Sequence, residues 1–172
     1  MPKARDLPTQ SELLEFLSYD PETGLLRWRY RPAGPPQWNG KHAGQIAGSI
    51  SKSQGHMVVN IGGRLLLVHR VIWKMVYGED VPEIDHEDTD ATNNRLMNLR
   101  RATHHQNMQN ARRHAGKDLP KGVSLRKRSG RFRSAIYLGG RQTFLGEFDS
   151  PAAAHAAYCA AAAVRGEFAR FD

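Results

Sequence analysis

The amino-acid sequence predicts an α+β protein built from two small units. The pattern of residues 83–113 predicts a strand, a polar loop, a returning strand and a helix, whereas residues 121–172 predict a three-stranded antiparallel sheet backed by one helix. The polar segment 114–120 contains Gly and Pro, and the composition changes across it. We therefore expect a first domain over residues 1–113 with its core at about 65–112, a linker over 114–120 and a second domain over 121–172.

The first domain is predicted to begin with a helix and a strand. Ser11 can cap a helix whose apolar positions 13, 14, 16 and 17 form one face. Leu26, Trp28 and Tyr30 then alternate with arginines, which predicts a strand with an apolar and a cationic face. That cationic face either contacts phosphate or is simply solvated. Residues 32–55 are rich in Gly, Pro and Ser and predict a loop with one short strand near 45–47.

A predicted hairpin and helix lead into the central stretch. Residues 57–61 and 65–68 flank a Gly-Gly pair, which favours a tight turn, and the apolar spacing of residues 69–77 predicts a helix that ends at Gly78. Residues 83–86 and 99–102 predict strands around a polar loop. Thr103 and Gln106 match a capping box, so we expect a helix from there to about Arg113.

The second domain is predicted to contain strands at 122–127, 131–138 and 141–146, joined by Ser-Gly and Gly-Gly turns. Ser150 and Pro151 have the residue types of a helix N-cap and first position, and Gly166 is expected to end that alanine-rich helix. One face of the sheet should then meet the helix and the other should face outward.

The charge of the chain favours a polyanionic partner. Lys and Arg outnumber Asp and Glu by 25 to 17, which gives a formal net charge of +8, and the excess is densest after residue 116. Such an excess favours nucleic acid as the partner, although a basic protein without such a partner has the same composition. The single cysteine excludes an internal disulfide and a Cys-rich zinc module. The sequence has no apolar run of membrane-spanning length and no signal peptide, so we expect a cytoplasmic protein without a membrane role.

The central stretch carries residue types suited to phosphodiester hydrolysis. His86 is a candidate general base because imidazole titrates near neutral pH. Asp85 and Asn107 offer oxygen ligands, which suit one Mg²⁺ or Mn²⁺ ion better than Zn²⁺. Asn98 can support the catalytic site by holding the imidazole or by fixing the loop. The alternative for these residues is an Asp- and Asn-rich turn, a capped helix and one exposed histidine.

The outward face of the second domain is a candidate DNA-binding surface. Strand alternation places a cationic set with two aromatic rings on it. Arginines can reach phosphates or guanine edges in a DNA groove, while aromatic rings pack on sugars or bases. The alternative is an ordinary solvated sheet face, and an RNA-binding surface stays open as well. The candidate residues are Arg126, Arg131, Arg133, Tyr137, Gln142 and Phe144.

The segments VHRVIWKMVYG and IDHEDTDATNNRLMNLRRATHHQNM resemble the HNH endonucleases of phages and mobile introns, over roughly residues 65–110. The shared elements are VHR, the DH pair, NNR, NL and a final Asn where many members have His. The resemblance implies a ββα-metal (His-Me finger) fold, with His86 as general base and products with 5′-phosphate and 3′-hydroxyl ends. It also implies metal binding by Asp85 and Asn107. His69 and Arg70 match the VHR element, whose residues either contact phosphate or pack at a helix start.

Residues 121–172 resemble the APETALA2-type DNA-binding domain. The shared elements are GV, GRF, LGEFDS, AAY and RGEFARF. The resemblance implies a three-stranded sheet that lies in the major groove, with DNA contacts at Arg126, Tyr137 and Phe144. Ser124 and Ala135 stand where plant members commonly carry charged, base-reading residues, so the recognised sequence does not transfer.

Together these features predict a homing-type phage endonuclease that a basic C-terminal domain positions on duplex DNA. We expect a monomer with one divalent metal and no organic cofactor, in the cytoplasm of a bacterial host. A non-cleaving DNA-binding regulator is the main alternative, and a phage recombination protein is another, although no tyrosine-recombinase catalytic set is present. The sequence leaves open the target site, the choice between nicking and double-strand cleavage, and whether the gene is free-standing or intron-encoded.

Overall fold

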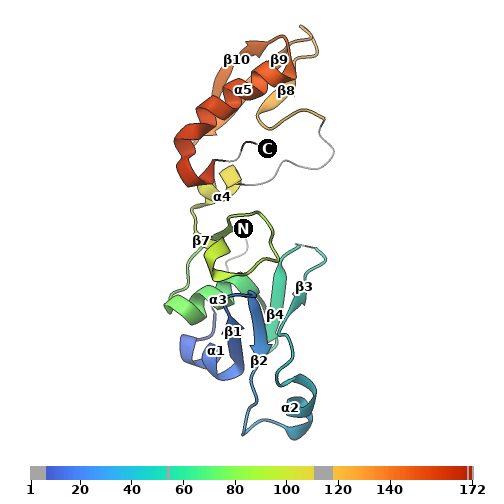
Figure 1. The fold of residues 1–172 in the computed structure, drawn as a ribbon, viewed down its shortest axis with the longest axis vertical. Helices are drawn as coiled ribbons and strands as arrows, with labels where there is room; N and C mark the ends of the chain where they lie inside the picture. The colour runs from blue at the N-terminus through green and yellow to red at the C-terminus, as the bar shows by residue number, and fades with distance from the viewer. Residues whose placement is uncertain (1–6, 54, 111–117, 170, 172) are drawn as a thin grey trace. The chain divides into compact units, whose positions relative to one another are not determined.

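The computed structural model describes residues 7–53, 55–110, 118–169 and 171. The backbone forms two compact units, Met1–Thr103 and His104–Asp172, and both contain helices and strands (Figure 1). The predicted helix end near Arg113 and the first part of the predicted linker lie outside the described residues. None of the helices within the described ranges is long and apolar enough to cross a membrane.

The first unit consists of short elements arranged as small antiparallel sheets with helices beside them (Figure 1). Its strands pair β1 with β2, β3 with β4, β4 with β5, and β6 with β7. The elements are α1 (Gln10–Phe16), β1 (Leu17–Asp20), β2 (Leu25–Trp28), α2 (Pro36–His42), β3 (Ser49–Ile50), β4 (Met57–Ile61), β5 (Arg64–Leu67), α3 (Val68–Tyr77), β6 (Ile84–His86), the 3₁₀ turn η1 (Leu96–Asn98) and β7 (Leu99–Arg101).

The predicted hairpin and following helix are confirmed. In the turn between β4 and β5, Gly62 and Gly63 have φ of 58° and 76°, values that favour glycine in a two-residue hairpin turn. Helix α3 ends at Gly78, whose φ of 74° places it in the left-handed region. Most apolar positions of α3 face the interior, and Val71 and Ile72 are fully buried, whereas Val76 is 39% exposed.

Three predictions for the N-terminal part were wrong in detail. The cap of α1 is Thr9, in a capping box with Glu12, and not Ser11. Strand β2 ends at Trp28, so Tyr30 lies outside it and is 67% exposed. Helix α2 stands inside the segment predicted as loop. The Asn39 amide of α2 exchanges two hydrogen bonds with the Arg31 backbone, at 2.7 and 3.0 Å, a contact that no local pattern predicts.

One apolar core holds the elements of the first unit together and sets the position of β6. Ile84 of β6 and Leu99 of β7 are both buried in the same cluster as the inward side chains of α1, β2, β4 and α3. The fully buried members of that cluster include Leu13, Leu17, Leu26, Val59, Val68, Val71 and Ile72. Ile84 thus anchors β6 in the core, and His86 at the end of β6 lies beside His69 of α3.

The second unit contains an antiparallel sheet in the order β10-β9-β8, as the sequence predicts. Ser150 caps α5 and Pro151 opens it, but α5 ends at Ala162 and a 3₁₀ turn that contains Gly166 follows. The prediction that Gly166 directly ends the helix was therefore wrong. The elements are α4 (His104–Asn110), β8 (Val123–Leu125), β9 (Phe132–Leu138), β10 (Arg141–Phe148), α5 (Pro151–Ala162) and η2 (Ala163–Phe168).

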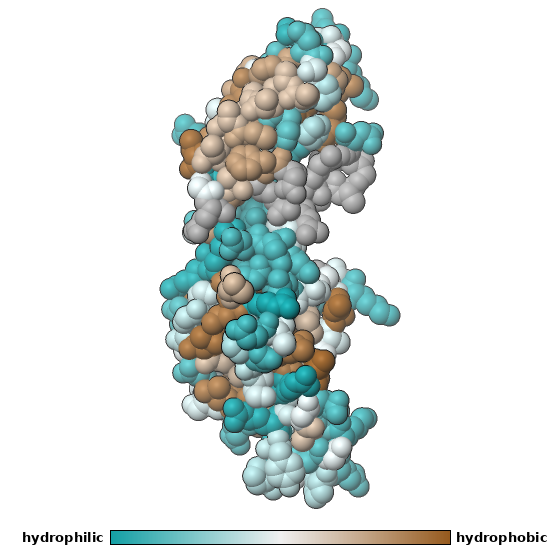
Figure 2. Space-filling model, in the orientation of Figure 1, coloured by the Kyte–Doolittle hydropathy of each residue, from teal (hydrophilic) through white to brown (hydrophobic). Residues whose placement is uncertain are grey.

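Small residues let α5 lie close to the sheet. Ala154 and Ala162 are fully buried, and Tyr158 packs with Ile136 of β9. At Gly122, a Cβ atom would lie 2.0 Å from the Tyr158 ring, so only glycine leaves room for that ring. The outward face of α5 is mostly alanine and forms a tan area in Figure 2. Helix α4, predicted as part of the first domain, falls in this second unit.

Candidate active site

Asp85 and His86 occupy adjacent positions on β6 and are both buried, at 5% and 6% exposure. Asp85 lies opposite Arg100 in the β6–β7 ladder. The Arg100 guanidinium is 2.9 Å from Asp85 Oδ2 through Nε and 2.8 Å through Nη2. The cross-strand pairing thus places a cation directly beside a buried carboxylate, and the two form a buried ion pair.

Asn94 orients the imidazole of His86. Its amide nitrogen donates to the Thr92 carbonyl at 3.1 Å, which turns the amide oxygen towards His86 Nε2 at 3.2 Å. An amide oxygen only accepts hydrogen bonds, so Nε2 of His86 carries the proton and Nδ1 carries the lone pair. Burial lowers the pKa of His86, although the Asn94 hydrogen bond and nearby carboxylates act against this. His86 is therefore neutral at pH 7 and able to accept a proton.

Asn98 fixes the loop between β6 and β7. Its amide nitrogen donates to Asp88 Oδ1 at 3.0 Å and to the Asn93 carbonyl at 2.8 Å, and its oxygen accepts from the Asp88 backbone at 3.0 Å. Asn93 also donates to Asp88 at 2.6 Å. Of the two supporting roles predicted for Asn98, these contacts match the one that fixes the loop, while Asn94 contacts the imidazole.

The β1–β2 hairpin holds the same loop from outside. Tyr19 donates its hydroxyl hydrogen to the Asn94 carbonyl at 2.9 Å, and Arg95 Nε donates to the Glu22 carbonyl at 2.7 Å. Gly24 has a φ of 76°, and a Cβ there would lie 2.6 Å from the Arg95 nitrogen. The hairpin therefore packs backbone against backbone on the residue that orients His86.

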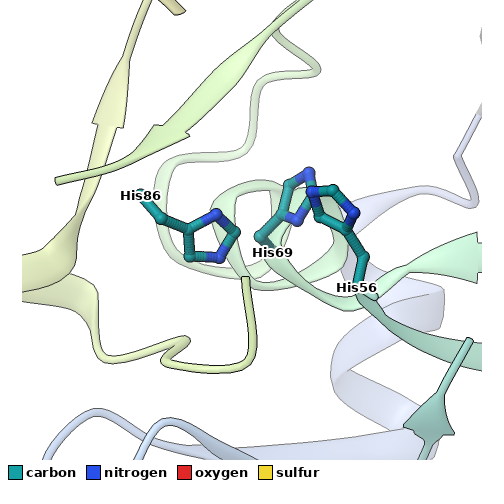
Figure 3. A group of neighbouring side chains, drawn as sticks. All are labelled: His56, His69 and His86. Atoms are coloured by element: carbon teal, nitrogen blue, oxygen red, sulfur yellow. The ribbon is translucent and has the colours of Figure 1, made fainter. Parts of the chain in front are cut away.

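Two further histidines lie beside His86. His69 of α3 and His56, from the segment before β4, have ring centroids 5.1 and 6.0 Å from that of His86 (Figure 3). Burial, together with the neighbouring His86, His56 and Arg70, lowers the pKa of His69 to about 3. All three rings meet in the interior of the first unit, which is a grouping that the sequence did not predict.

The VHR residues are placed differently from their predicted phosphate contacts. His69 is only 6% exposed, so the packed alternative fits it. The Arg70 side chain is 12% exposed and forms an ion pair with Asp80. In this structure His69 is thus packed at the start of α3 and Arg70 is paired.

Asn107, the second predicted metal ligand, lies on α4 in the second unit. Asp85 and His86 lie in the first unit. A shared metal site of Asp85 and Asn107 therefore stays a prediction.

The predicted DNA-binding residues share one face of the second sheet. The β9–β10 register places Tyr137 opposite Gln142, and Phe144 opposite Ala135. Tyr137 and Phe144 are 52% and 53% exposed, and the Arg133 guanidinium lies 5.2 Å from the centre of the Phe144 ring. Two exposed arginines already have acidic partners at 3.0 Å, namely Arg126 with Glu147 and Arg131 with Asp149.

Two residues of the site escaped sequence reasoning. Asn94 belongs to the NNR element, which follows closely after the candidate general base His86. That position in the sequence could have identified Asn94 as a residue of the site. His56 lies 30 positions before His86 in a turn without regular spacing, and no local pattern indicates it. Only the packing of β4 beside α3 brings it to the other two rings.

Comparison with known protein families supports the HNH resemblance of the central stretch. Residues 66–109, from β5 into α4, match the family model described as HNH endonuclease. The searches of curated proteins and of solved structures each gave no match. HNH nucleases use divalent metals and act on DNA. Residues 66–109 are therefore similar to the HNH endonucleases, a family of nucleases that hydrolyse nucleic acid, and this similarity supports a nuclease domain there.

Proposed function

We propose that this protein is a metal-dependent DNA endonuclease of the homing type. His86 is its general base, Asp85 and Asn107 hold one divalent metal ion, and the C-terminal unit positions the enzyme on duplex DNA. The observation that carries the proposal is the Asp85–His86 pair within the matched segment, with a buried imidazole whose tautomer is set by Asn94.

The geometry of His86 suits proton abstraction from water. Nδ1 has the lone pair, and the lowered pKa keeps that lone pair available at pH 7. Asn94 holds the ring, while Asn98 and Tyr19 hold the loop that carries Asn94, so the lone pair keeps one direction. Such positioning reduces the entropy lost on reaching the transition state.

The proposed ligands fit a hard divalent cation. Asp85 offers a carboxylate and Asn107 an amide oxygen, which are the donor types that Mg²⁺ and Mn²⁺ prefer over Zn²⁺. When bound, such an ion would neutralise charge that develops on the phosphate and the leaving oxygen. Arg100 pairs with the same Asp85 carboxylate that would bind the cation.

The second unit is proposed to bind the duplex through its β-sheet face, in line with its resemblance to APETALA2-type domains. The exposed Phe144 and Tyr137 rings suit packing on sugars or bases. Arg126 and Arg131 would exchange their carboxylate partners for phosphates, since both ion pairs are partly exposed and therefore weak. Before DNA binds, the ion pairs with Glu147 and Asp149 would hold Arg126 and Arg131 on this face of the β-sheet.

Cleavage of supercoiled plasmid tests the enzyme. The protein is incubated with plasmid in Mg²⁺ and in EDTA, and His86→Ala is compared with His42→Ala, a histidine of the same unit outside the site. We expect Mg²⁺-dependent relaxation or linearisation that falls by about 10²- to 10⁴-fold in His86→Ala, the usual worth of a general base. His42→Ala should cut like the wild type. Gel shifts without cleavage of any substrate, including the native genomic locus, would establish the non-cleaving regulator instead.

Binding measurements test the β-sheet face separately. Phe144→Ala should weaken duplex binding by about 1–3 kcal/mol if the ring packs on a base or sugar. Arg131→Ala should reduce the slope of log affinity against log salt by about one, as expected for one phosphate contact. Lys52→Ala, a change of an exposed cation in the first unit, serves as the control and should leave the slope unchanged. Equal slopes in all three proteins would exclude Arg131 as a phosphate ligand.

A further inference from the structure

Three imidazole side chains from separate elements of the first unit meet in one place. His56 precedes β4, His69 lies on α3 and His86 ends β6, and Figure 3 shows the rings gathered together. One ring nitrogen from each residue lies within 4.8 Å of the corresponding nitrogens of the other two. This is the spacing of a ligand set, and it arises from the tertiary fold alone.

His69 gives a second, independent indication of a ligand. Its side chain is 6% exposed, and its Nδ1 atom is buried without a hydrogen-bond partner in the described structure. A buried polar atom left in this state costs about 1–3 kcal/mol. Nearly all buried polar atoms in folded proteins have partners, so an orphan nitrogen within a histidine cluster calls for a bound group that accepts its lone pair or its proton.

We infer that His56, His69 and His86 form a binding site for a transition-metal ion of the zinc class. Imidazole nitrogens suit Zn²⁺, Co²⁺ and Ni²⁺, whereas Mg²⁺ prefers oxygen. Three protein ligands leave the fourth tetrahedral position to water. This site is chemically different from the oxygen site proposed for Asp85 and Asn107.

Carboxylates near His86 favour a bound cation. Metal binding needs neutral imidazoles. The charges of Asp85 and Asp88 act on His86 and favour a positive ion there. The positive charge of Arg70 disfavours a cation at His69, but Arg70 forms an ion pair with Asp80.

Loading the site requires only a small closure of the rings. Zn–N bonds of about 2.0–2.1 Å place the nitrogens of a tetrahedral site roughly 3.3 Å apart, so the widest pair must close by about 1.5 Å. His56 is half-buried and stands in a turn, so it can supply most of this movement. The same partial exposure gives an ion a path from solvent.

Metal loading would switch off the nuclease, a consequence that rests on the function proposed above. A neutral imidazole that binds a metal through one nitrogen carries its proton on the other. His86 then has no lone pair with which to accept a proton from water. Zinc-class ions would therefore act as inhibitors of Mg²⁺-dependent cleavage by occupying the general base.

Co²⁺ binding tests the site without any activity measurement. The metal-free full chain is titrated with Co²⁺, whose visible absorption reports tetrahedral coordination, and Zn²⁺ is then added to displace it. We expect one ion per chain in the wild type and in His42→Ala. In His56→Ala the affinity should fall at least tenfold, since even loss of a group behind a ligand costs about 10- to 100-fold. Circular dichroism checks that the variant is folded. Equal Co²⁺ affinity in His56→Ala and the wild type would overturn the site.

Zn²⁺ inhibition of plasmid cleavage tests the switch. With Mg²⁺ in excess, stoichiometric Zn²⁺ should inhibit the wild type and His42→Ala, while His56→Ala should resist at least about tenfold more Zn²⁺. Equal inhibition of all three proteins would refute the switch. If no protein cuts under any condition, the proposed nuclease function fails, and the Co²⁺ titration still decides whether the metal site exists.

Discussion

The buried ion pair between Asp85 and Arg100 makes a sharp prediction about stability. The two side chains are 6% and 14% exposed, and the guanidinium lies 2.8–2.9 Å from Asp85 Oδ2. Arg100→Met removes the cation and leaves a buried carboxylate without its main compensation. We expect the free energy of unfolding of the first unit to fall by about 3–5 kcal/mol, the usual cost of breaking such a pair.

The neighbouring residue supplies a matched control. Arg101 pairs with Glu79 at 3.2 Å, but these side chains are 61% and 42% exposed. Solvent screens such a pair, so Arg101→Met should cost no more than about 1 kcal/mol. The two substitutions have the same chemistry at adjacent positions of β7 and differ in burial.

Urea unfolding followed by tryptophan fluorescence measures both variants. The three tryptophans, Trp28, Trp38 and Trp73, all lie in the first unit, so the signal reports that unit. EDTA is kept in all samples. The double variant Asp85→Leu with Arg100→Met should recover much of the loss, because a well-packed apolar pair often replaces a buried ion pair without cost. Similar losses in Arg100→Met and Arg101→Met would refute the assigned burial and pairing of Asp85.

Three other changes follow from the structure. Folded His69 excludes a proton that the unfolded chain binds, because its pKa is lowered to about 3. In EDTA the free energy of unfolding should therefore fall as the pH is lowered from 6.5 to about 3. His69 should contribute a slope of up to about 1.4 kcal/mol per pH unit, and this contribution should disappear in His69→Gln. Gly24→Ala places a Cβ 2.7 Å from the Asn94 carbonyl carbon, so it should displace the residue that orients His86 and lower the cleavage rate by about tenfold or more. Gly122→Ala meets the Tyr158 ring at 2.0 Å with φ at 79°, and should destabilise the second unit by about 2–4 kcal/mol in thermal unfolding followed by circular dichroism.

Each of these changes has a control of the same kind. His42→Gln should leave the acid slope of the wild type intact, and an unchanged slope in His69→Gln would contradict the buried, neutral ring. Gly62 and Gly130 also have positive φ but open space around the added Cβ, so alanine there costs only about 1–2 kcal/mol of backbone strain. Losses at Gly24 and Gly122 no larger than these would refute the close contacts.

Much of the fold follows from local patterns. Alternation and a Gly-Gly turn predict the β4–β5 hairpin, and helical spacing with Gly78 predicts α3, because both depend on neighbours within a few residues. The strands of the second unit were likewise predictable from alternation and turn residues. Helix α2 was not, since it depends on contacts between Asn39 and the distant Arg31 backbone.

The sequence by itself determined the kind of chemistry. Asp85, His86 and Asn98 lie within one short stretch, where their residue types suit phosphodiester hydrolysis and the surrounding motifs resemble those of the HNH endonucleases. The tertiary structure decided the working state of those residues. Arg100 forms a buried ion pair with Asp85, and Asn94 sets the tautomer of His86, because both contacts depend on what surrounds each group in space. The histidine cluster with His56 has the same origin, since residues far apart in the chain become ligands of one site only when the core packs them together.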